Sequence, residues 1–287
     1  MTLRIGFLVF PGVQQLDLTG PYEVFASAPG TKVELVWKSL EPITTATDLV
    51  LTPDLTFADA PRFDVVCVPG GGGVNALLGD AETLDFLRRQ AAGARYVTSV
   101  CTGSLLLGAA GLLRGRKATT HWNAVDFLPA FGAIPVEARV VRDGSLFTAG
   151  GVTSGIDFAL VVVAELIGET EARTIQLALE YAPAPPFGDG TPATAAPEIL
   201  ATAKARMAGS RFELLDCAGT YFQLARYDAI SDEPDAVFVR RLMREAGVAT
   251  IPVSAFHHDG FDAKLIRFCF AKSEALIAQA CERLCAY

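Results

Sequence analysis

Short runs of β-branched and aliphatic residues alternate with amphipathic stretches over the first two-thirds of the chain. The apolar runs predict strands at residues 3–10, 33–39, 64–69, 96–100, 117–121, 138–143 and 145–150. Stretches with helical spacing predict helices at residues 21–28, 82–92, 103–113, 122–131, 154–168 and 169–182. Because parallel strands are joined by helical crossovers, this alternation predicts an α/β fold, a mainly parallel sheet with helices on both faces.

The pattern changes at a proline-rich segment, residues 182–197, which we expect to form no regular element. Beyond it, the sequence predicts strands at residues 219–227, 249–256 and 264–271, and helices at residues 234–247 and 273–284. These elements form a small α+β unit with a pattern of its own. We therefore expect two domains, residues 1–207 and residues 208–287.

The composition is that of a globular protein with a large core, since 51% of the 287 residues are hydrophobic and 20% are charged. With a net charge of −8, the chain lacks the basic surface that nucleic acid or an anionic membrane would require. Residues 96–113 are uncharged and long enough to span a membrane, but their glycines favour a buried strand, turn and helix. The first residues are typical of a strand rather than a signal peptide, so we expect a cytoplasmic protein.

Six cysteines in a chain of this length do not indicate a disulfide scaffold, and three histidines without a CxxC pair predict no metal site. Cys101 stands out because it ends an apolar strand and precedes Thr-Gly-Ser at the start of a helix. At such a corner a residue is held in a strained turn above the sheet edge, as in a nucleophile elbow. The helix N-terminus favours a thiolate, so we expect a lowered thiol pKa. The alternative is a buried, inert cysteine.

Asp17 is a second candidate, because its predicted loop follows the first strand and so lies at the same sheet edge as Cys101. A protonated Asp17 would donate a hydrogen bond to the sulfur and serve as an acid, whereas an ionised one would oppose the thiolate. The alternative is that Asp17 only caps a helix that begins near Thr19.

Two further motifs end strands at this edge. The run PGGGG, residues 69–73, supplies backbone N–H groups able to approach a reacting atom, and we expect Gly71 and Gly72 to take that role. A tight strand-to-helix turn is the alternative. His121 ends another strand and is a candidate base or polar contact for the thiol, or otherwise a half-buried histidine without a catalytic role.

Several motifs, taken together and in order, carry a family resemblance: FPGVQQLDLTGPYEVF (10–25), VPGGGG (68–73), SVCTGS (99–104), TTHWN (119–123), TAGGVTSGID (148–157) and EYAPAPPFGDGTP (180–192). Residues 1–207 resemble the ThiJ/PfpI superfamily, which has a flavodoxin-like fold related to class I glutamine amidotransferase domains. The most similar subgroup is isonitrile hydratase. The resemblance implies that Cys101 is the nucleophile, that Asp17 and Thr102 are required, and that no metal or organic cofactor takes part.

The same resemblance implies a homodimer, since the helix at residues 20–28 is a dimer contact in relatives. The protease-like branch has histidine directly after its cysteine, where this chain has Thr102, so proteolysis is not expected. The C-terminal segment resembles something different, the small domain of class I and II aminotransferases. The lysine-bearing cofactor domain of those enzymes has no counterpart here, so we expect a packing or assembly module in which Arg267 is a surface or interface residue rather than a substrate ligand.

The predicted reaction is the hydration of an isonitrile to an N-substituted formamide, through a thioimidate on Cys101. Two alternatives stay open on the sequence alone. One is another cysteine-dependent activity of the superfamily, of the glyoxalase or amide hydrolase type. The other is a sensor without turnover, in which Cys101 responds to oxidation or to a ligand.

Overall fold

The structure is a computed structural model that describes residues 2–207, 213–214, 222–256, 261–269, 279–280, 283–284 and 287. The chain forms two compact units, Met1–Ala184 and Pro185–Tyr287. The predicted boundary at residue 207, where the ThiJ/PfpI resemblance ends, stays a prediction.

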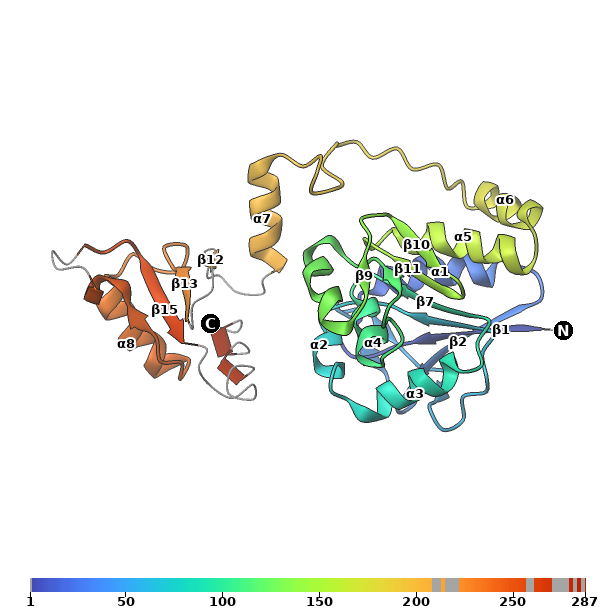
Figure 1. Ribbon diagram of the computed structural model, residues 1–287, viewed down its shortest axis with the longest axis horizontal. Coiled ribbons are helices and arrows are strands. Elements are labelled where there is room, and N and C mark those ends of the chain that lie inside the picture. The colour runs from blue at the N-terminus through green and yellow to red at the C-terminus, as the bar shows by residue number, and fades with distance from the viewer. Residues whose placement is uncertain are drawn as a thin grey trace. The chain divides into compact units, whose positions relative to one another are not determined.

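The first unit is built on a seven-stranded sheet (Figure 1). In spatial order its strands are β10 (Val140–Asp143), β11 (Leu146–Ala149), β7 (Tyr96–Val100), β6 (Val65–Val68), β1 (Leu3–Leu8), β2 (Thr31–Trp37) and β5 (Leu55–Thr56). All neighbours are parallel except β10, which pairs with β11 in the antiparallel sense. The predicted mainly parallel, flavodoxin-like sheet is therefore confirmed.

Helices cover both faces of this sheet, as the alternating pattern predicts. One face carries α1 (Gln15–Ala26), α5 (Ser154–Leu166) and α6 (Glu169–Ala178), and the other carries α2 (Val74–Leu77), α3 (Ala81–Ala91) and α4 (Gly103–Ala109). The strand β6 is buried along its whole length and β7 is buried except at Tyr96, because helices shield these strands on both sides. Smaller elements complete the unit: the strand pairs β3 (Ile43–Thr44) with β4 (Val50–Leu51) and β8 (Lys117–Ala118) with β9 (Ile134–Pro135), and a 3₁₀ helix at Trp122–Phe131.

Helix α1 begins six residues earlier than expected, at Gln15 instead of residue 21. The sequence places Pro21 at a helix start, where proline is common, but here it lies inside the helix. Its ring packs against Gly155 of α5, since a Cβ atom built on Gly155 would lie 2.9 Å from Pro21 Cδ. The prediction of a loop at residues 13–21 was therefore wrong, and Asp17 lies in the first turn of a helix.

The second unit contains α7 (Pro197–Met207), α8 (Asp235–Glu245) and a four-stranded sheet in the order β12 (Glu213–Leu214), β13 (Phe222–Arg226), β15 (Leu265–Cys269) and β14 (Ile251–Pro252). The predicted strand at residues 249–256 is short because Pro252 has no N–H for a sheet, and a 3₁₀ turn, Val253–Phe256, follows. Between α6 and α7, residues 181–196 form no helix or strand, as predicted. Most of the predicted helix at residues 273–284 lies outside the described residues.

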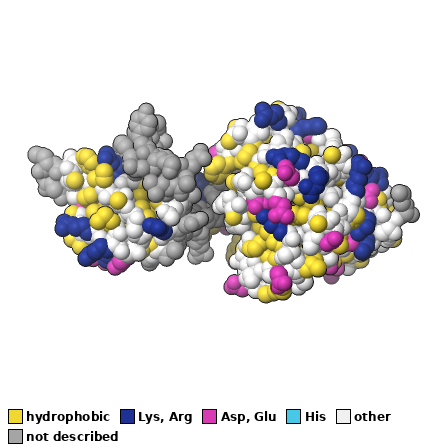
Figure 2. Space-filling view, turned by 90° about the horizontal axis from the view of Figure 1, so that it is seen from below, with side chains coloured by type: hydrophobic (Ala, Val, Ile, Leu, Met, Phe, Trp, Pro, Cys, Tyr) yellow, Lys and Arg dark blue, Asp and Glu magenta, His cyan; other side chains and the backbone are white. Residues whose placement is uncertain are grey.

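The core of the second unit is small and aromatic. Tyr227 and Phe238 stack with their ring centroids 4.1 Å apart, and both are fully buried. Within the described part of the chain, no helix is long and apolar enough to cross a membrane. Acidic and basic side chains are interspersed on the face of the first unit that Figure 2 shows.

Candidate active site

Cys101 occupies a strained corner between β7 and α4. Its backbone φ is +55°, the left-handed region that residues with a Cβ atom rarely adopt. The corner is tight because Gly103 lies against β6: a Cβ atom there would stand 2.0 Å from the carbonyl oxygen of Val68. The strand, the strained residue and the helix follow one another as the sequence predicts for a nucleophile elbow.

Three hydrogen bonds hold the backbone of Cys101 in this conformation. Its N–H donates to the carbonyl of Ala149 on β11, at 2.9 Å. Its carbonyl oxygen accepts from the hydroxyls of Thr120, at 2.9 Å, and Ser104, at 3.2 Å, both of which are buried. A left-handed residue costs about 1–3 kcal/mol, and each such hydrogen bond contributes about 0.5–1.5 kcal/mol, so the three together offset the strain.

Asp17 lies opposite this corner, on the first turn of α1. Its Oδ2 atom accepts a hydrogen bond of 2.9 Å from the N–H of Gly70, at the end of β6. Its carboxylate therefore binds a neighbouring loop and does not cap its own helix, whose N-cap residue is Gln14. The other oxygen, Oδ1, is buried and makes no hydrogen bond of good geometry with a described residue.

Gly70 is the residue around which Asp17 and Thr102 meet. A Cβ atom on Gly70 would lie 2.6 Å from both the backbone nitrogen and the hydroxyl of Thr102, and 2.9 Å from Asp17 Oδ2. Only glycine leaves room for these groups to converge beside the thiol. The structure thus brings together Cys101, Asp17 and Thr102, which lie on two elements far apart in the sequence.

Burial governs the protonation of the pair. It raises the pKa of the Asp17 carboxyl to about 7, with the Gly70 N–H and the Cys101 thiol acting in the lowering direction. Burial also raises the pKa of the Cys101 thiol, and the negative charge of Asp17 adds to the increase, while the Thr102 N–H and hydroxyl oppose it. Both groups therefore keep their protons to a higher pH than usual, and the thiol stays protonated when Asp17 ionises.

The expected lowering of the thiol pKa by the N-terminus of α4 was therefore wrong. Cys101 is only 7% exposed, and α4 is seven residues long, so loss of hydration and the nearby carboxylate outweigh the helix. The thiol can act as a nucleophile only if a nearby group accepts its proton. Asp17, with its unoccupied Oδ1, is the acceptor that the structure provides.

The glycine run contributes differently from the prediction. The Gly71 N–H, expected to face a developing oxyanion, donates to the Thr102 hydroxyl oxygen at 3.0 Å. Gly71 also has a φ of +132° and lies against the backbone of Gln14 and Gly12, so it fixes the loop. Gly72 is exposed, and a Cβ atom on it would meet nothing within 4 Å.

His121 caps the 3₁₀ helix that follows it, with Nδ1 accepting from the N–H of Asn123 at 3.3 Å. Its ring lies beside that of Trp122, and burial lowers its pKa. A hydrogen bond to Cys101 is made by its neighbour Thr120 instead. The role of His121 as a base or substrate contact stays a prediction.

Sequence reasoning missed the residues that fix the backbone of the elbow, namely Ser104, Thr120 and Gly70. The sequence does contain a signal for the first two. Ser104 and Thr120 are hydroxyl residues within the motifs SVCTGS and TTHWN, in which Cys101 and His121 were the residues considered. The sequence predicts a strained turn at Cys101, but it does not predict the contact that makes the corner tight, the packing of Gly103 against β6.

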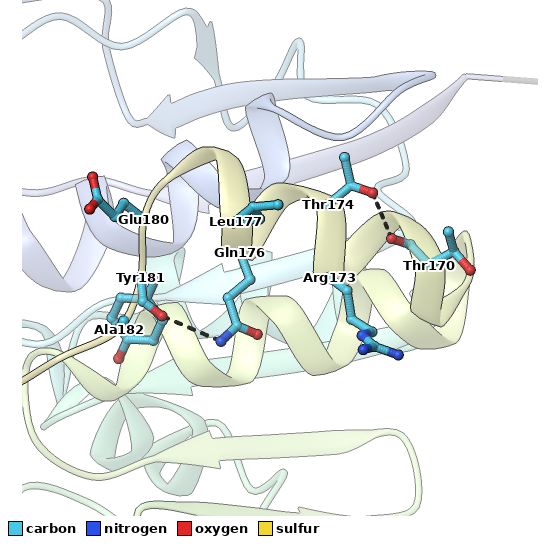
Figure 3. Close-up of a pocket in the computed structure, with 8 residues that line it drawn as sticks. All are labelled: Thr170, Arg173, Thr174, Gln176, Leu177, Glu180, Tyr181 and Ala182. Carbon is cyan, nitrogen blue, oxygen red and sulfur yellow. Dashed lines mark hydrogen bonds between the residues drawn. The ribbon is translucent and has the colours of Figure 1, made fainter.

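A hollow of about 580 Å³ lies elsewhere, along α6 and the turn after it (Figure 3). It contains none of the predicted site residues; its lining is Thr170, Arg173, Thr174, Gln176, Leu177, Glu180, Tyr181 and Ala182. Among the described residues, no group of three or more His, Cys, Asp or Glu side chains is arranged to hold a metal ion.

The fold and the strained cysteine define a class of protein. The profile of the DJ-1/PfpI family matches residues 3–165, and the chain belongs to this family. Isonitrile hydratase of Pseudomonas putida is 62% identical over 210 residues, which cover 73% of this chain and 92% of the relative. A crystal structure of a ThiJ/PfpI family protein from Pseudomonas syringae superimposes with a TM-score of 0.71 at 48% identity, covering 72% of this chain and 87% of that one. The predicted resemblance is confirmed.

The second unit has a different relative. Methionine aminotransferase of Escherichia coli is 52% identical over 75 residues, which cover 26% of this chain and only 19% of that enzyme. A match this short does not show that this chain has aminotransferase activity. Arg267 is half-buried on β15, and its guanidinium lies 4.5 Å from the centre of the Phe256 ring.

Proposed function

We propose that this chain is an isonitrile hydratase that adds water to an isonitrile and releases the N-substituted formamide. The observation that carries the proposal is the pair of Cys101 and Asp17 at a strained elbow, where burial raises the pKa of both groups. The similarity to the hydratase of Pseudomonas putida supports it, because the match spans nearly all of that enzyme.

In the first step, sulfur attacks the terminal carbon of R–N≡C. The S–H bond breaks and its proton passes to Asp17, a C–S bond forms, and Asp17 then delivers the proton to the same carbon. The product is a thioimidate, R–N=CH–S, attached to Cys101. A carboxyl with a pKa of about 7 suits this task, since it accepts and returns a proton at neutral pH with little cost.

In the second step, the ionised Asp17 takes a proton from water as the water oxygen attacks the thioimidate carbon. The N–H of Thr102 faces the anion that forms, and the Thr102 hydroxyl orients the water. Asp17 passes this proton to the nitrogen of the intermediate. The C–S bond then breaks as the hydroxyl group on the same carbon becomes the formyl C=O, the hydroxyl proton passes through Asp17 to the sulfur, and R–NH–CHO leaves. The residues present account for every proton transferred, so the reaction requires no metal or organic cofactor.

Cys101 is only 7% exposed, so the substrate must be small at its reacting end. The terminal carbon of an isonitrile meets this requirement, as it is linear and unsubstituted. We also expect a cytoplasmic homodimer, formed through the helix at residues 20–28, as in relatives.

Turnover of cyclohexyl isocyanide by the purified chain tests the proposal, with formamide formation as the readout and Cys101→Ala as the control. Methylglyoxal and a simple amide belong in the same panel. Formation of lactate or release of ammonia in place of formamide would favour the glyoxalase or amidase alternatives. Oxidation of Cys101 without turnover of any substrate would favour a sensor.

A further inference from the structure

The carbonyl oxygen of Cys101 receives two hydroxyl groups from different parts of the chain. Ser104 is on α4, three residues further along, and Thr120 follows β8, 19 residues away in the sequence. Both side chains are at least 98% buried, so no water competes for their hydroxyls. Two buried hydroxyls on one carbonyl indicate that its direction is fixed.

The direction of this carbonyl sets the direction of an N–H group. The peptide bond is planar and trans, so the Cys101 carbonyl and the Thr102 N–H point in opposite directions from one rigid unit. Thr102 N–H acts on the sulfur, where it favours the thiolate. The Thr102 nitrogen and Asp17 Oδ2 also both lie next to Gly70, within 3 Å of the position that a Cβ atom there would take.

The backbone at Cys101 is strained, with a left-handed φ, and its surroundings must hold it. The Thr102 N–H would turn away from the sulfur if the Cys101–Thr102 peptide rotated about ψ of Cys101 and φ of Thr102, and that rotation would break both hydroxyl hydrogen bonds to the Cys101 carbonyl. The Thr120 hydroxyl opposes the rotation from outside the elbow, because its own segment is anchored by a 2.8 Å bond from the Thr119 N–H to the Thr148 hydroxyl.

We propose that Thr120, assisted by Ser104, is a positioning residue that holds the Cys101–Thr102 peptide so that the Thr102 N–H faces the sulfur. It touches neither the sulfur nor the substrate and acts through the peptide. Hydrogen bonds to a carbonyl also polarise the peptide, which makes its N–H a better donor to a developing anion. The consequence for turnover rests on the proposed function, but the consequence for thiol reactivity does not.

The test compares Thr120→Val, which keeps the shape and removes the hydroxyl, with Thr120→Ser, which restores it. Thr119→Val is the matched control, since Thr119 is equally buried and its hydroxyl makes no hydrogen bond to Cys101. Two quantities are measured: the rate constant for alkylation of Cys101 by iodoacetamide between pH 6 and 10, followed by peptide mass spectrometry, and the melting temperature.

Thr120→Val is expected to slow alkylation about three- to tenfold between pH 6 and 10. Thr120→Ser and Thr119→Val should retain the wild-type profile, and Ser104→Ala should show the smaller loss. In the hydratase assay, Thr120→Val should lower kcat with little change in KM. An unchanged alkylation profile in Thr120→Val, or equal changes in Thr120→Val and Thr119→Val, would overturn the proposal. Because alkylation needs no isonitrile, it tests the positioning role even if the chain hydrates none.

Discussion

Two cysteines, one within β6 and the other just after the neighbouring strand β7, show what separates a packing thiol from a candidate nucleophile. Cys67 lies within β6 and is 1% exposed, and its sulfur accepts the Thr98 hydroxyl at 3.1 Å. Burial raises the pKa of Cys67 to about 12, and it raises that of Cys101 as well. Burial therefore does not distinguish the two.

The difference lies in what faces each sulfur. Cys67 lies in an extended strand, and the group that faces its sulfur is the Thr98 hydroxyl. No carboxyl contributes to the shift in its pKa. Cys101 has a left-handed backbone, the Thr102 N–H and the Asp17 carboxyl, a group able to accept its proton. Reactivity in this protein thus depends on a proton acceptor and a fixed N–H donor rather than on a thiol that is ionised at rest.

The largest expected effect separates the two cysteines directly. Cys101→Ala should abolish isonitrile hydration, with a loss of at least about 10³-fold in kcat/KM, because no other group replaces the nucleophile. Cys67→Ala should leave kcat/KM within about threefold of wild type and cost about 1–2 kcal/mol in stability, as a buried side chain is shortened. Steady-state kinetics and urea unfolding measure the two losses. Equal activity in the two variants would show that Cys101 is no more important to the reaction than Cys67.

The next effect concerns the proton acceptor. Asp17→Asn keeps the shape of the side chain and removes proton transfer, so kcat should fall about 10²- to 10⁴-fold. In the wild type, the rate should rise with pH through about 7, as Asp17 becomes able to accept the thiol proton. A pH–rate profile of both proteins checks this. Persistence of the same inflection in Asp17→Asn would assign it to another group.

The raised pKa of Asp17 should also make the free energy of unfolding depend on pH. Its pKa is about 7 in the folded protein and 3.8 in the unfolded chain, so protonation stabilises the fold and that stability is lost as pH rises from about 4 to 7. The shift corresponds to roughly 4 kcal/mol. Relative to wild type, Asp17→Asn should therefore gain stability across this range and level off above pH 8. Urea unfolding at several pH values measures the gain; a constant difference would mean that Asp17 is ionised throughout.

The smallest expected effect tests the convergence at Gly70. Gly70→Ala places a Cβ atom against Thr102 and Asp17 and should lower kcat/KM about ten- to 100-fold, with a loss of about 1–3 kcal/mol in stability. Gly72→Ala, two residues on in open space, is the matched control and should behave like wild type. Similar losses in the two variants would indicate a general effect of loop rigidity.

Much of this picture could be predicted from the sequence, since strand and helix periodicity and the apolar run before Cys101 are local signals. The start of α1 was mispredicted because Pro21 is tolerated inside the helix only through the missing side chain of Gly155, a tertiary contact. The same is true of the thiol pKa: helix polarity can be inferred from the sequence, but the depth of burial that outweighs it cannot. The sequence and its family resemblance pointed to Cys101, Asp17 and Thr102, which the structure brings together, whereas the hydroxyls on the Cys101 carbonyl required coordinates.

The central claim is that the Cys101 sulfur bonds to the isonitrile carbon. Wild-type protein mixed with cyclohexyl isocyanide, quenched in acid during turnover and digested, tests it by peptide mass spectrometry. Covalent catalysis by Cys101 predicts a peptide containing Cys101 that is heavier by the mass of one substrate molecule, an increase absent from the Cys67 peptide and diminishing as substrate is consumed. Formamide production with no adduct on Cys101 at any quench time, and undiminished in Cys101→Ala, would contradict it.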